Sequence, residues 1–237
     1  SYTNIINPQI IYARVENASS GCYDVVEVIL KVNQLPVITL DESYRLCVDQ
    51  NGLPIASEEG AASPPVIDTG LDDVLYSFEW SIDGVVQVGE TGASIIATTG
   101  GVYQATITQL SSGCQTAVST TVTVSQAPVT WSFNLLNGAF ADNHSVEILA
   151  EGLGEYVYSI DGGPFQDSNV FDNVSPGVHT ITIKDANGCG QVSFDIGVVD
   201  YPNYFTPNND GYHDTWNIIG IAEFDATANI YIFDRYG

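Results

Sequence analysis

The sequence predicts an all-β protein, made of tandem immunoglobulin-like β-sandwich modules that form a rod and end in the truncated start of a further β-sandwich domain. Three observations predict this class. Tyr, Val, Ile and Thr, which favour strands, are plentiful, and Met is absent. No stretch shows ten or more residues with the i, i+3, i+4 apolar rhythm of a helix. One hairpin pattern also recurs along the chain, as described next.

The recurring hairpin reads as a strand, a Gly-Cys turn, a second strand and a proline exit. Residues Ala13–Pro36 align without a gap on Ala105–Pro128, and a looser third copy runs from His179 to Pro202. Self-similarity of this kind is the signature of a repeated supersecondary unit. The sequence therefore predicts at least three hairpins of one type.

A second repeated feature lies upstream of the later hairpins. Tyr76–Gly84 and Glu155–Gly162 each alternate apolar and polar residues and end in an Asp-Gly turn. Within the first of these copies Trp80 falls on a central strand, and Tyr103 starts the penultimate strand of the same module. We expect both aromatic side chains to fill the core of a sandwich.

Prolines mark the predicted domain boundaries, because Pro36 and Pro128 cannot donate to a central strand ladder. A third boundary is expected near Asp200. The predicted domains are the C-terminal hairpin of a truncated immunoglobulin-like module (1–36), an immunoglobulin-like module (37–127), a shorter one (128–200) and the opening of a fourth domain (201–237).

The net charge of −24 excludes nucleic acid as a ligand, since a polyanion cannot release counterions from phosphates, and it disfavours anionic membranes. The charge fits either a solvated extracellular surface or carboxylates neutralised by divalent cations at module junctions. No apolar run approaches the roughly 20 residues of a membrane span, so we expect no transmembrane segment. Ser1 follows no signal-peptide pattern, and we expect the chain to be a fragment or a processed product.

The four cysteines indicate an oxidising compartment. Cys47 and Cys114 both fall inside the second predicted module, so a disulfide between them is the first choice. Cys22 is expected to find its partner upstream of Ser1, and Cys189 has no mate within its own module. Four cysteines allow three pairings, and the connectivity stays open at this point.

No catalytic constellation is present in the sequence. The three histidines, His144, His179 and His213, are far apart in the sequence, and neither a nucleophile motif nor a phosphate-binding glycine loop occurs. His179 is interpreted as a solvent-facing strand residue. We therefore predict that this region is not an enzyme and needs no cofactor.

One stretch could bind calcium. Asn208, Asp210 and Asp214 place oxygen-bearing side chains around Gly211, as in the second half of a calcium loop. Thr206 stands where such a loop has its first Asp, and the bidentate Glu is lacking. The alternative is a structural turn in which the Asn and Asp side chains bond the backbone.

The residues from 201 onward resemble the gliding-motility-associated C-terminal domain, which is the type B sorting domain of the type IX secretion system. The matching motifs are Tyr204–Gly211, His213–Trp216 and Ile230–Gly237, with Asn209 in place of the usual Gly and His213 in place of the usual Asn. Upstream, Tyr158–Gln166 and Lys184–Cys189 look like the repeats of SprB-type gliding adhesins.

This resemblance implies export through the type IX translocon and retention at the cell surface, attached to the outer membrane by a small outer-membrane β-barrel partner. The residues that carry the sorting motif or could dock that partner are Tyr201, Tyr204, Phe205, Thr206, Pro207, Asn208, Asp210, Gly211, Asp214 and Trp216. The aromatic members could equally fill the domain's own core.

Two functions follow from the resemblance. In one, the chain is the C-terminal stalk and anchor of a large surface adhesin, used for gliding motility or attachment. In the other, it is the spacer and sorting tag of a secreted protease or polysaccharide hydrolase whose catalytic domain lies upstream. The repeats favour the adhesin, because a stalk of many modules provides reach.

Overall fold

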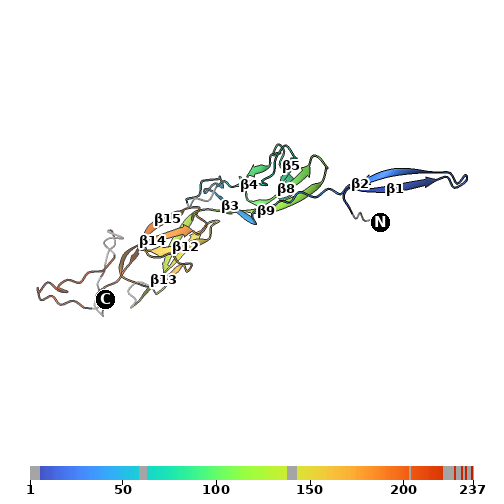
Figure 1. Cartoon of the computed structure of the whole chain (residues 1–237). Coiled ribbons are helices and arrows are strands. Elements are labelled where there is room, and N and C mark those ends of the chain that lie inside the picture. The colour runs from blue at the N-terminus through green and yellow to red at the C-terminus, as the bar shows by residue number, and fades with distance from the viewer. Residues whose placement is uncertain are drawn as a thin grey trace. The chain divides into compact units, whose positions relative to one another are not determined.

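The computed structural model describes residues 6–58, 63–137, 143–202 and 204–220, together with residues 227, 231, 233 and 236. This part of the chain forms fifteen β-strands and contains no helix. Figure 1 colours the strands by their place in the chain, from blue at the N-terminus to red at the C-terminus. The predicted all-β class is confirmed.

The first hairpin is a two-stranded antiparallel sheet of β1 (Gln9–Glu16) and β2 (Tyr23–Leu30). Its eight residue pairs run from Gln9 opposite Leu30 to Glu16 opposite Tyr23. A short turn closes the ribbon, where the Asn17 N–H donates to the Cys22 carbonyl at 2.8 Å. The hairpin predicted within residues 1–36 is therefore present as a ribbon of two strands.

Seven strands follow: β3 (Ser43–Cys47), β4 (Val66–Asp68), β5 (Tyr76–Ile82), β6 (Val85–Val86), β7 (Ser94–Ile96), β8 (Gly101–Gln109) and β9 (Gln115–Ser125). They form a five-stranded sheet with the order β3-β9-β8-β5-β6 and a two-stranded sheet of β4 and β7. In the larger sheet β5 pairs antiparallel with both β6 and β8, whereas β3 runs parallel to the end of β9.

Trp80 and Tyr103 are both fully buried, as predicted. Trp80 lies on β5 and pairs with Ala105 of β8. Its indole N–H donates to the Gly92 carbonyl at 2.9 Å, so the one polar atom of this buried ring has a partner. The two aromatic side chains therefore serve packing.

The last six strands form a β-sandwich: β10 (Thr130–Leu135), β11 (His144–Glu151), β12 (Tyr156–Ile160), β13 (Val170–Val174), β14 (Gly177–Asp185) and β15 (Gln191–Val198). One sheet has the order β10-β11-β13 and the other has the order β12-β14-β15. Both sheets contribute to a common buried core of Val146, Ile148, Tyr158, Phe171, Val174, Ile181, Ile183, Ile196 and Val198.

The side chain of His179 corrects one prediction. His179 was interpreted as solvent-facing, but the residue is only 8% exposed. Side chains two residues apart lie on the same face of a strand, so His179 shares the inward face of β14 with Ile181 and Ile183. The prediction was wrong because it placed His179 on the opposite face of the strand from Ile181 and Ile183, whereas all three side chains share one face.

The repeated Asp-Gly turns are present in both predicted places. Asp83 and Gly84 follow β5 with φ angles of 49° and 80°, and Asp161 and Gly162 follow β12 with φ angles of 52° and 69°. Two successive positive φ angles are typical of the type I′ turn, for which Asp-Gly is a preferred sequence. The local sequence therefore accounts for both turns.

The chain divides into two compact units. The first comprises residues 1–41, 68–95 and 102–120, and the second comprises residues 42–67, 96–101 and 121–237. The second unit thus combines β3 and the end of β9 with the whole six-stranded sandwich. The boundaries predicted from the prolines stay a prediction.

Candidate functional site: the disulfide junction and the C-terminal segment

The disulfide joins Cys47 to Cys189, which are 142 residues apart in sequence and 5.1 Å apart between their Cα atoms. Cys47 ends β3, and Cys189 lies in the turn between β14 and β15. Both cysteines are buried and belong to the second compact unit. Cys22 and Cys114 carry free thiols, so the predicted Cys47–Cys114 bond is wrong.

The length of β9 explains why Cys47 does not meet Cys114. Cys47 pairs with Ser125 at the C-terminal end of this strand, whereas Cys114 directly precedes its first residue, Gln115. An extended strand rises about 3.3 Å per residue, so the two ends of β9 are roughly 30 Å apart. A disulfide requires Cα atoms within about 7 Å.

A buried carboxylate lies beside this disulfide. Asp185 is 0% exposed, and its oxygens accept hydrogen bonds from the Ser125 hydroxyl at 2.9 and 3.0 Å. They also accept from the backbone N–H groups of Glu155 at 3.1 Å and Cys189 at 3.0 Å. A buried charge is tolerated when its hydrogen-bonding capacity is satisfied in this way.

Further hydrogen bonds hold the turn that carries Cys189. The Asn187 side chain donates to the Ser125 hydroxyl at 3.1 Å and accepts a hydrogen bond from the Arg45 guanidinium. The Gly188 carbonyl accepts from the Glu58 N–H at 3.0 Å and from the Ser57 hydroxyl at 3.2 Å. We call this set of contacts, together with the disulfide, the disulfide junction.

Two glycines allow backbone segments to pack closely against each other in the disulfide junction. A Cβ atom on Gly154 would lie 2.6 Å from the Gln126 carbonyl oxygen, and one on Gly190 would lie 3.1 Å from the Ala127 Cβ. Gly190 also has a φ of +124°, which side chains rarely adopt. The linker at residues 126–127 is therefore seated against the sandwich that follows it.

Sequence reasoning missed Asp185, Ser125, Arg45 and Asn187. A usable signal existed for Asp185, because it shares its side of β14 with Ile181 and Ile183 and so belongs to the inward face. No sequence signal pointed to Ser125, Arg45 or Asn187. Their roles arise from contacts between segments distant in the chain.

The C-terminal segment is attached to the end of the sandwich. Asp200 and Ile219 exchange backbone hydrogen bonds, and a Cβ on Gly220 would lie 2.6 Å from the Val198 carbonyl oxygen. The Trp216 indole donates to the Pro202 carbonyl at 3.0 Å, and its ring lies 5.9 Å from that of Tyr201. Residues 200–220 are thus held by a few specific contacts.

The predicted calcium residues lie together in one turn. The Asp214 carboxylate accepts from the N–H groups of Gly211, at 2.7 Å, and Asn209, while Asp210 accepts from the Tyr212 N–H at 2.8 Å. The bond from Gly211 is the main cause of a lowered pKa at Asp214, and the bond from Tyr212 is the main cause at Asp210. The carboxylates act as acceptors for the backbone, which is the Asx-turn arrangement.

The described residues offer no further metal site. No group of three or more His, Cys, Asp or Glu side chains that could hold a metal ion occurs in the part of the chain that the structure describes. Calcium binding at Asn208, Asp210 and Asp214 stays one of the two alternatives predicted for this turn.

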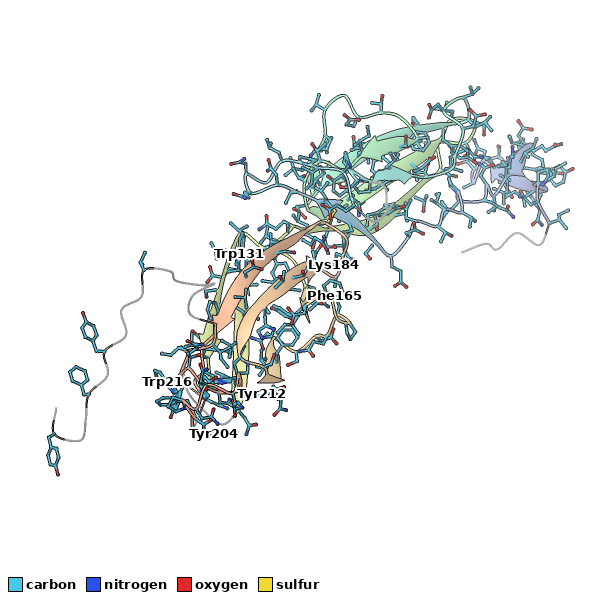
Figure 2. The ribbon with its side chains drawn as sticks, turned by 90° about the vertical axis from the view of Figure 1, so that its left-hand side faces the viewer. Trp131, Phe165, Lys184, Tyr204, Tyr212 and Trp216 are labelled. Carbon is cyan, nitrogen blue, oxygen red and sulfur yellow. A yellow bond between two sulfur atoms is a disulfide. The ribbon has the colours of Figure 1, made fainter. Side chains whose placement is uncertain are left out.

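Most of the predicted sorting and docking residues are exposed. Tyr204 is 63% exposed and Phe205 is 50% exposed, whereas Trp216 is half-buried. Figure 2 shows Tyr204, Tyr212 and Trp216 near one end of the sandwich. Thr206, Pro207, Asn208, Asp210 and Gly211 are also exposed. The motif at Ile230–Gly237 lies largely outside the described residues.

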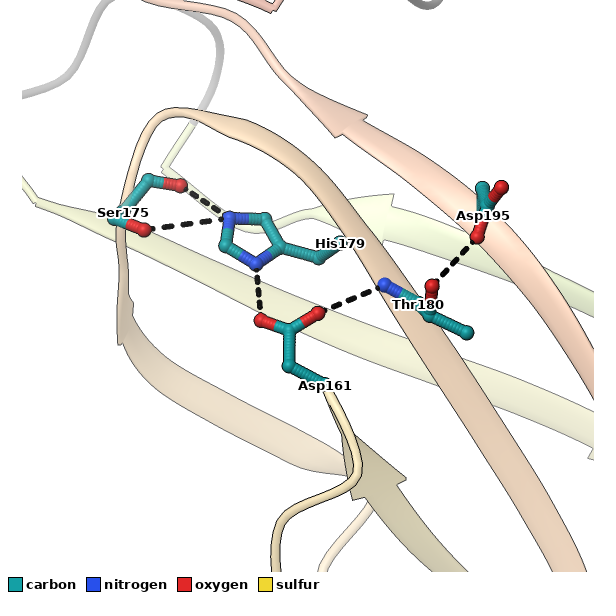
Figure 3. A network of polar contacts seen from close by, with 5 residues as sticks. All are labelled: Asp161, Ser175, His179, Thr180 and Asp195. Carbon is teal, nitrogen blue, oxygen red and sulfur yellow. Dashed lines mark hydrogen bonds and ion pairs between the residues drawn. The ribbon is translucent and has the colours of Figure 1, made fainter.

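A polar network around His179 contains a serine, a histidine and an aspartate (Figure 3). The His179 Nδ1 lies 2.6 Å from Asp161 Oδ2, and Nε2 lies 2.6 Å from the Ser175 carbonyl oxygen but 3.4 Å from its hydroxyl. A catalytic base needs a free ring nitrogen directed at the nucleophile, whereas here both nitrogens face oxygen acceptors. The network ties the β13–β14 turn to the turn after β12.

Asp161 has a lowered pKa. Partial burial by itself raises the pKa, but the hydrogen bond from His179, the bond from the Thr180 N–H and the attraction to His179 together outweigh it. The Asp161 carboxylate therefore stays ionised and holds both partners.

Two hollows and two ring contacts also lie on the described part of the chain. A hollow of about 320 Å³ is lined by Val74, Leu75, Gln109, Leu110 and Ser111, and one of about 260 Å³ is lined by Thr130, Trp131, Ser132, Leu149 and Glu151. Trp131 contacts Phe194 at a ring distance of 6.1 Å, and Lys184 lies 5.5 Å from the Phe165 ring centre. Figure 2 labels Trp131, Phe165 and Lys184 on the sandwich.

None of the described residues forms a helix long and apolar enough to cross a membrane.

Two family models match the ends of the chain. The CHU_C type IX secretion signal domain matches residues 199–237, and the Flavobacterium inter-domain disulphide bond domain matches residues 1–36. The chain carries a type IX secretion signal domain at its C-terminus, which confirms the predicted resemblance. It carries a Flavobacterium inter-domain disulphide bond domain at its N-terminus. The secretion signal implies export to the surface or the extracellular space.

Comparisons with solved structures give distant matches. The amphioxus IgVJ-C2 molecule matches at a TM-score of 0.36 and 11% identity, covering 56% of this chain and 94% of that one. Fibronectin(III)-like modules of Clostridium thermocellum CbhA match at 0.31 and 13%, covering 68% and 94%. Domains 1–6 of the surface layer protein SbsC match at 0.27 and 14%, covering 90% and 39%. A comparison with curated proteins finds no match.

Proposed function

We propose that this chain is the C-terminal stalk and anchoring region of a large adhesin that the type IX secretion system exports to the cell surface for gliding motility or attachment. The observation that carries the proposal is the order of parts: a type IX signal domain directly follows a sandwich that is bonded covalently to the preceding strand β3. The domain supplies the route, and the disulfide junction supplies a stiff connection.

The disulfide junction suits a part that transmits force. Cys47 and Cys189 close a loop of 142 residues, and a bond across a loop of this size contributes about 5 kcal/mol in the chain-entropy model. The hydrogen bonds to the buried Asp185 add to this, since bonds to charged groups contribute about 1.5–3 kcal/mol each. A spacer needs reach, whereas a load-bearing stalk also needs junctions that resist opening.

The net charge of −24 supports the same location. A strongly charged surface repels other copies of itself and stays solvated outside the cell. No Lys or Arg occurs between Arg45 and Lys184, so proteases that cleave after basic residues find no site there. Both properties suit a protein exposed to the medium.

Anchoring belongs to the same proposal. The exposed rings of Tyr201, Tyr204 and Phe205 provide an apolar surface on the signal domain, and such aromatic positions are enriched at protein interfaces. We expect this surface to bind the small outer-membrane β-barrel partner. Replacing Tyr204 and Phe205 by Ser would then release the protein into the medium without stopping its export.

Export is tested by fusing the complete C-terminal region of the protein, from residue 42 onward so that Cys47 and Cys189 are both included, to a fluorescent cargo in a gliding host. Surface fluorescence is expected from the fusion and not from a version that ends before Tyr201. Surface display that persists after this deletion would show that residues 201–237 are not the sorting signal.

The adhesin role is tested in a host strain that lacks the gene. We expect cell attachment and spreading to fall while secretion of other proteins continues. Unchanged attachment, together with loss of a secreted hydrolytic activity, would favour the alternative function as spacer and sorting tag of an enzyme.

A further inference from the structure

The two cysteines of the disulfide junction lie in different structural elements. Cys189 lies in the turn of a repeated hairpin, β14–β15, and Cys47 lies at the end of β3, a strand that runs parallel to β9. The β9 strand itself belongs to the preceding copy of the hairpin, β8–β9. The disulfide thus links the turn of the β14–β15 hairpin to β3, and β3 runs parallel to the end of β9 in the preceding β8–β9 hairpin.

The turn of β8–β9 carries a cysteine in a similar setting. Its Gln109 N–H donates to the Cys114 carbonyl at 2.9 Å, and its Gly113 N–H donates to the Gln109 carbonyl at 2.8 Å. In β14–β15 the Asp185 N–H donates to the Gly190 carbonyl at 2.9 Å, and Cys189 directly precedes Gly190. Both four-residue loops present a cysteine at or next to their closing pair, but only Cys189 is bonded.

An apolar surface adjoins the turn that carries Cys114. Val74, Leu75 and Leu110 are 78%, 56% and 58% exposed, and they line the hollow of about 320 Å³. The Leu110 N–H donates to the Leu75 carbonyl at 3.0 Å, which holds the turn and the loop before β5 together. The corresponding loop before β12 includes Gly154, which packs on the linker at Gln126.

The repeat of the hairpin sequence indicates which segment would cover the apolar surface of Val74, Leu75 and Leu110. Residues 13–36 align on residues 105–128, so Gln34 corresponds to Gln126 and Asn33 to Ser125. β9 has the parallel neighbour β3 that ends in Cys47, while β1 and β2 form a sheet of two strands. Tyr12, Val26 and Ile29 on this ribbon are more than half exposed, although a two-stranded hairpin is marginal by itself.

We propose that the surface of Val74, Leu75, Leu110 and Cys114 is the docking face for the exit of the preceding module, the one that β1 and β2 close. Cys114 forms a disulfide with a cysteine at the C-terminal end of a strand parallel to β2, opposite Asn33. The linker around Gln34 and Leu35 covers the apolar hollow. Cys114, which lies outside residues 1–36, thereby has a role that is independent of the ligand that the adhesin binds.

The bond forms by thiol–disulfide exchange with a disulfide-bearing oxidoreductase of the oxidising compartment through which the protein passes. The Cys114 thiol and its partner thiol each give up one proton and one electron, and their sulfur atoms join. The disulfide of the oxidoreductase takes up both electrons and both protons and becomes a dithiol.

The pairing is tested on the protein purified from its host. Free thiols are alkylated in acid, and the unreduced protein is digested after Glu residues. This digestion places the four cysteines on separate peptides, at residues 17–27, 43–58, 91–147 and 156–223, whereas trypsin leaves Cys47 and Cys114 on one peptide. Mass spectrometry then identifies the linked pairs.

We expect peptide 43–58 linked to 156–223, which serves as the internal control, and peptide 91–147 linked to a cysteine peptide from outside residues 1–237. An alkylated Cys114, a link from Cys114 to Cys22, a link to a second copy of Cys114, or a protein without the expected cysteine would each overturn the proposal.

The apolar surface has its own test by hydroxyl-radical footprinting. Leu75 and Leu110 are expected to be oxidised several-fold more slowly in the protein from the host than in the isolated chain of residues 1–237. Val88, which is 98% exposed and lies outside the proposed face, is the control and should react equally in both. Equal oxidation of Leu75 and Leu110 in the two samples would overturn the docking face.

Discussion

The β1–β2 and β14–β15 hairpins are copies of one sequence pattern in different surroundings. Each has eight antiparallel residue pairs and a cysteine in or at its turn. On β14 the side chains of His179, Ile181 and Ile183 are buried, whereas Tyr12 and Val15 on β1 are 69% and 67% exposed. The pattern therefore specifies the strand pairing, and burial comes from a second sheet that packs on the hairpin.

The largest expected effect is on the disulfide that only the β14–β15 hairpin has. Replacing Cys47 and Cys189 together by Ser should lower the free energy of unfolding of the second unit by about 3–5 kcal/mol, because the unfolded chain gains entropy. Hydrogen exchange should accelerate in β14–β15 and not in β1–β2. The matched control replaces Cys22 and Cys114 by Ser, and both variants are measured on the isolated chain of residues 1–237, in which these two thiols are free. Equal acceleration in both hairpins would contradict this difference.

A smaller effect is expected from the buried carboxylate. Asp185→Asn keeps the shape of the side chain but turns an amide N–H₂ toward backbone donors, which should cost about 2 kcal/mol. Asp195→Asn is the control, because Asp195 is exposed and accepts a hydrogen bond from Thr180, and it should cost less than about 0.5 kcal/mol. Urea unfolding measures both, and equal costs would contradict the role of Asp185.

Alternation along the strands was sufficient to predict much of the fold. It placed Trp80 and Tyr103 inside and located the Asp-Gly turns, because these features depend on residues close in sequence. The same alternation, applied correctly, also identifies His179 and Asp185 as inward-facing. The error there came from misreading the parity of the strand.

The disulfide pairing could not be predicted in the same way. Cys47 and Cys114 share a predicted module, but they lie at opposite ends of β9, and only the three-dimensional register of β3 reveals this. The contacts of Ser125 and Asn187 depend equally on segments that are distant in sequence. The secretion signal, by contrast, was found from its motif, since it is a contiguous stretch.

A pH effect of a few tenths of a kcal/mol is expected at Asp161. The native pKa lies below the ordinary value of 3.8, so the unfolded state binds a proton first as the pH falls. The stabilisation is complete well above pH 3.8 and is lost as the pH falls through the lowered pKa, and it is small because the side chain is 52% exposed. The difference in unfolding free energy between wild type and Asp161→Asn should therefore shrink between pH 5 and pH 3, as urea titrations can measure. A difference independent of pH would contradict the lowered pKa of Asp161.

The smallest effect on the sandwich is expected from the turn at residues 206–214, which is a local structure like the β1–β2 turn. Asp214→Ala removes the acceptor for the N–H groups of Asn209 and Gly211, so these two amides should exchange faster while the melting temperature stays unchanged. Because the pKa of Asp214 is lowered in the folded turn, mainly by the hydrogen bond from the Gly211 N–H, its stabilisation of the turn is present above the ordinary carboxyl pKa and is lost as the pH falls through the lowered pKa. Asn217→Ala is the control for a nearby exposed polar side chain.

Because the carboxylate oxygens already accept backbone hydrogens, titration with calcium should give no heat. Heat that appears with wild type and disappears with Asp210→Ala would instead establish a calcium site here.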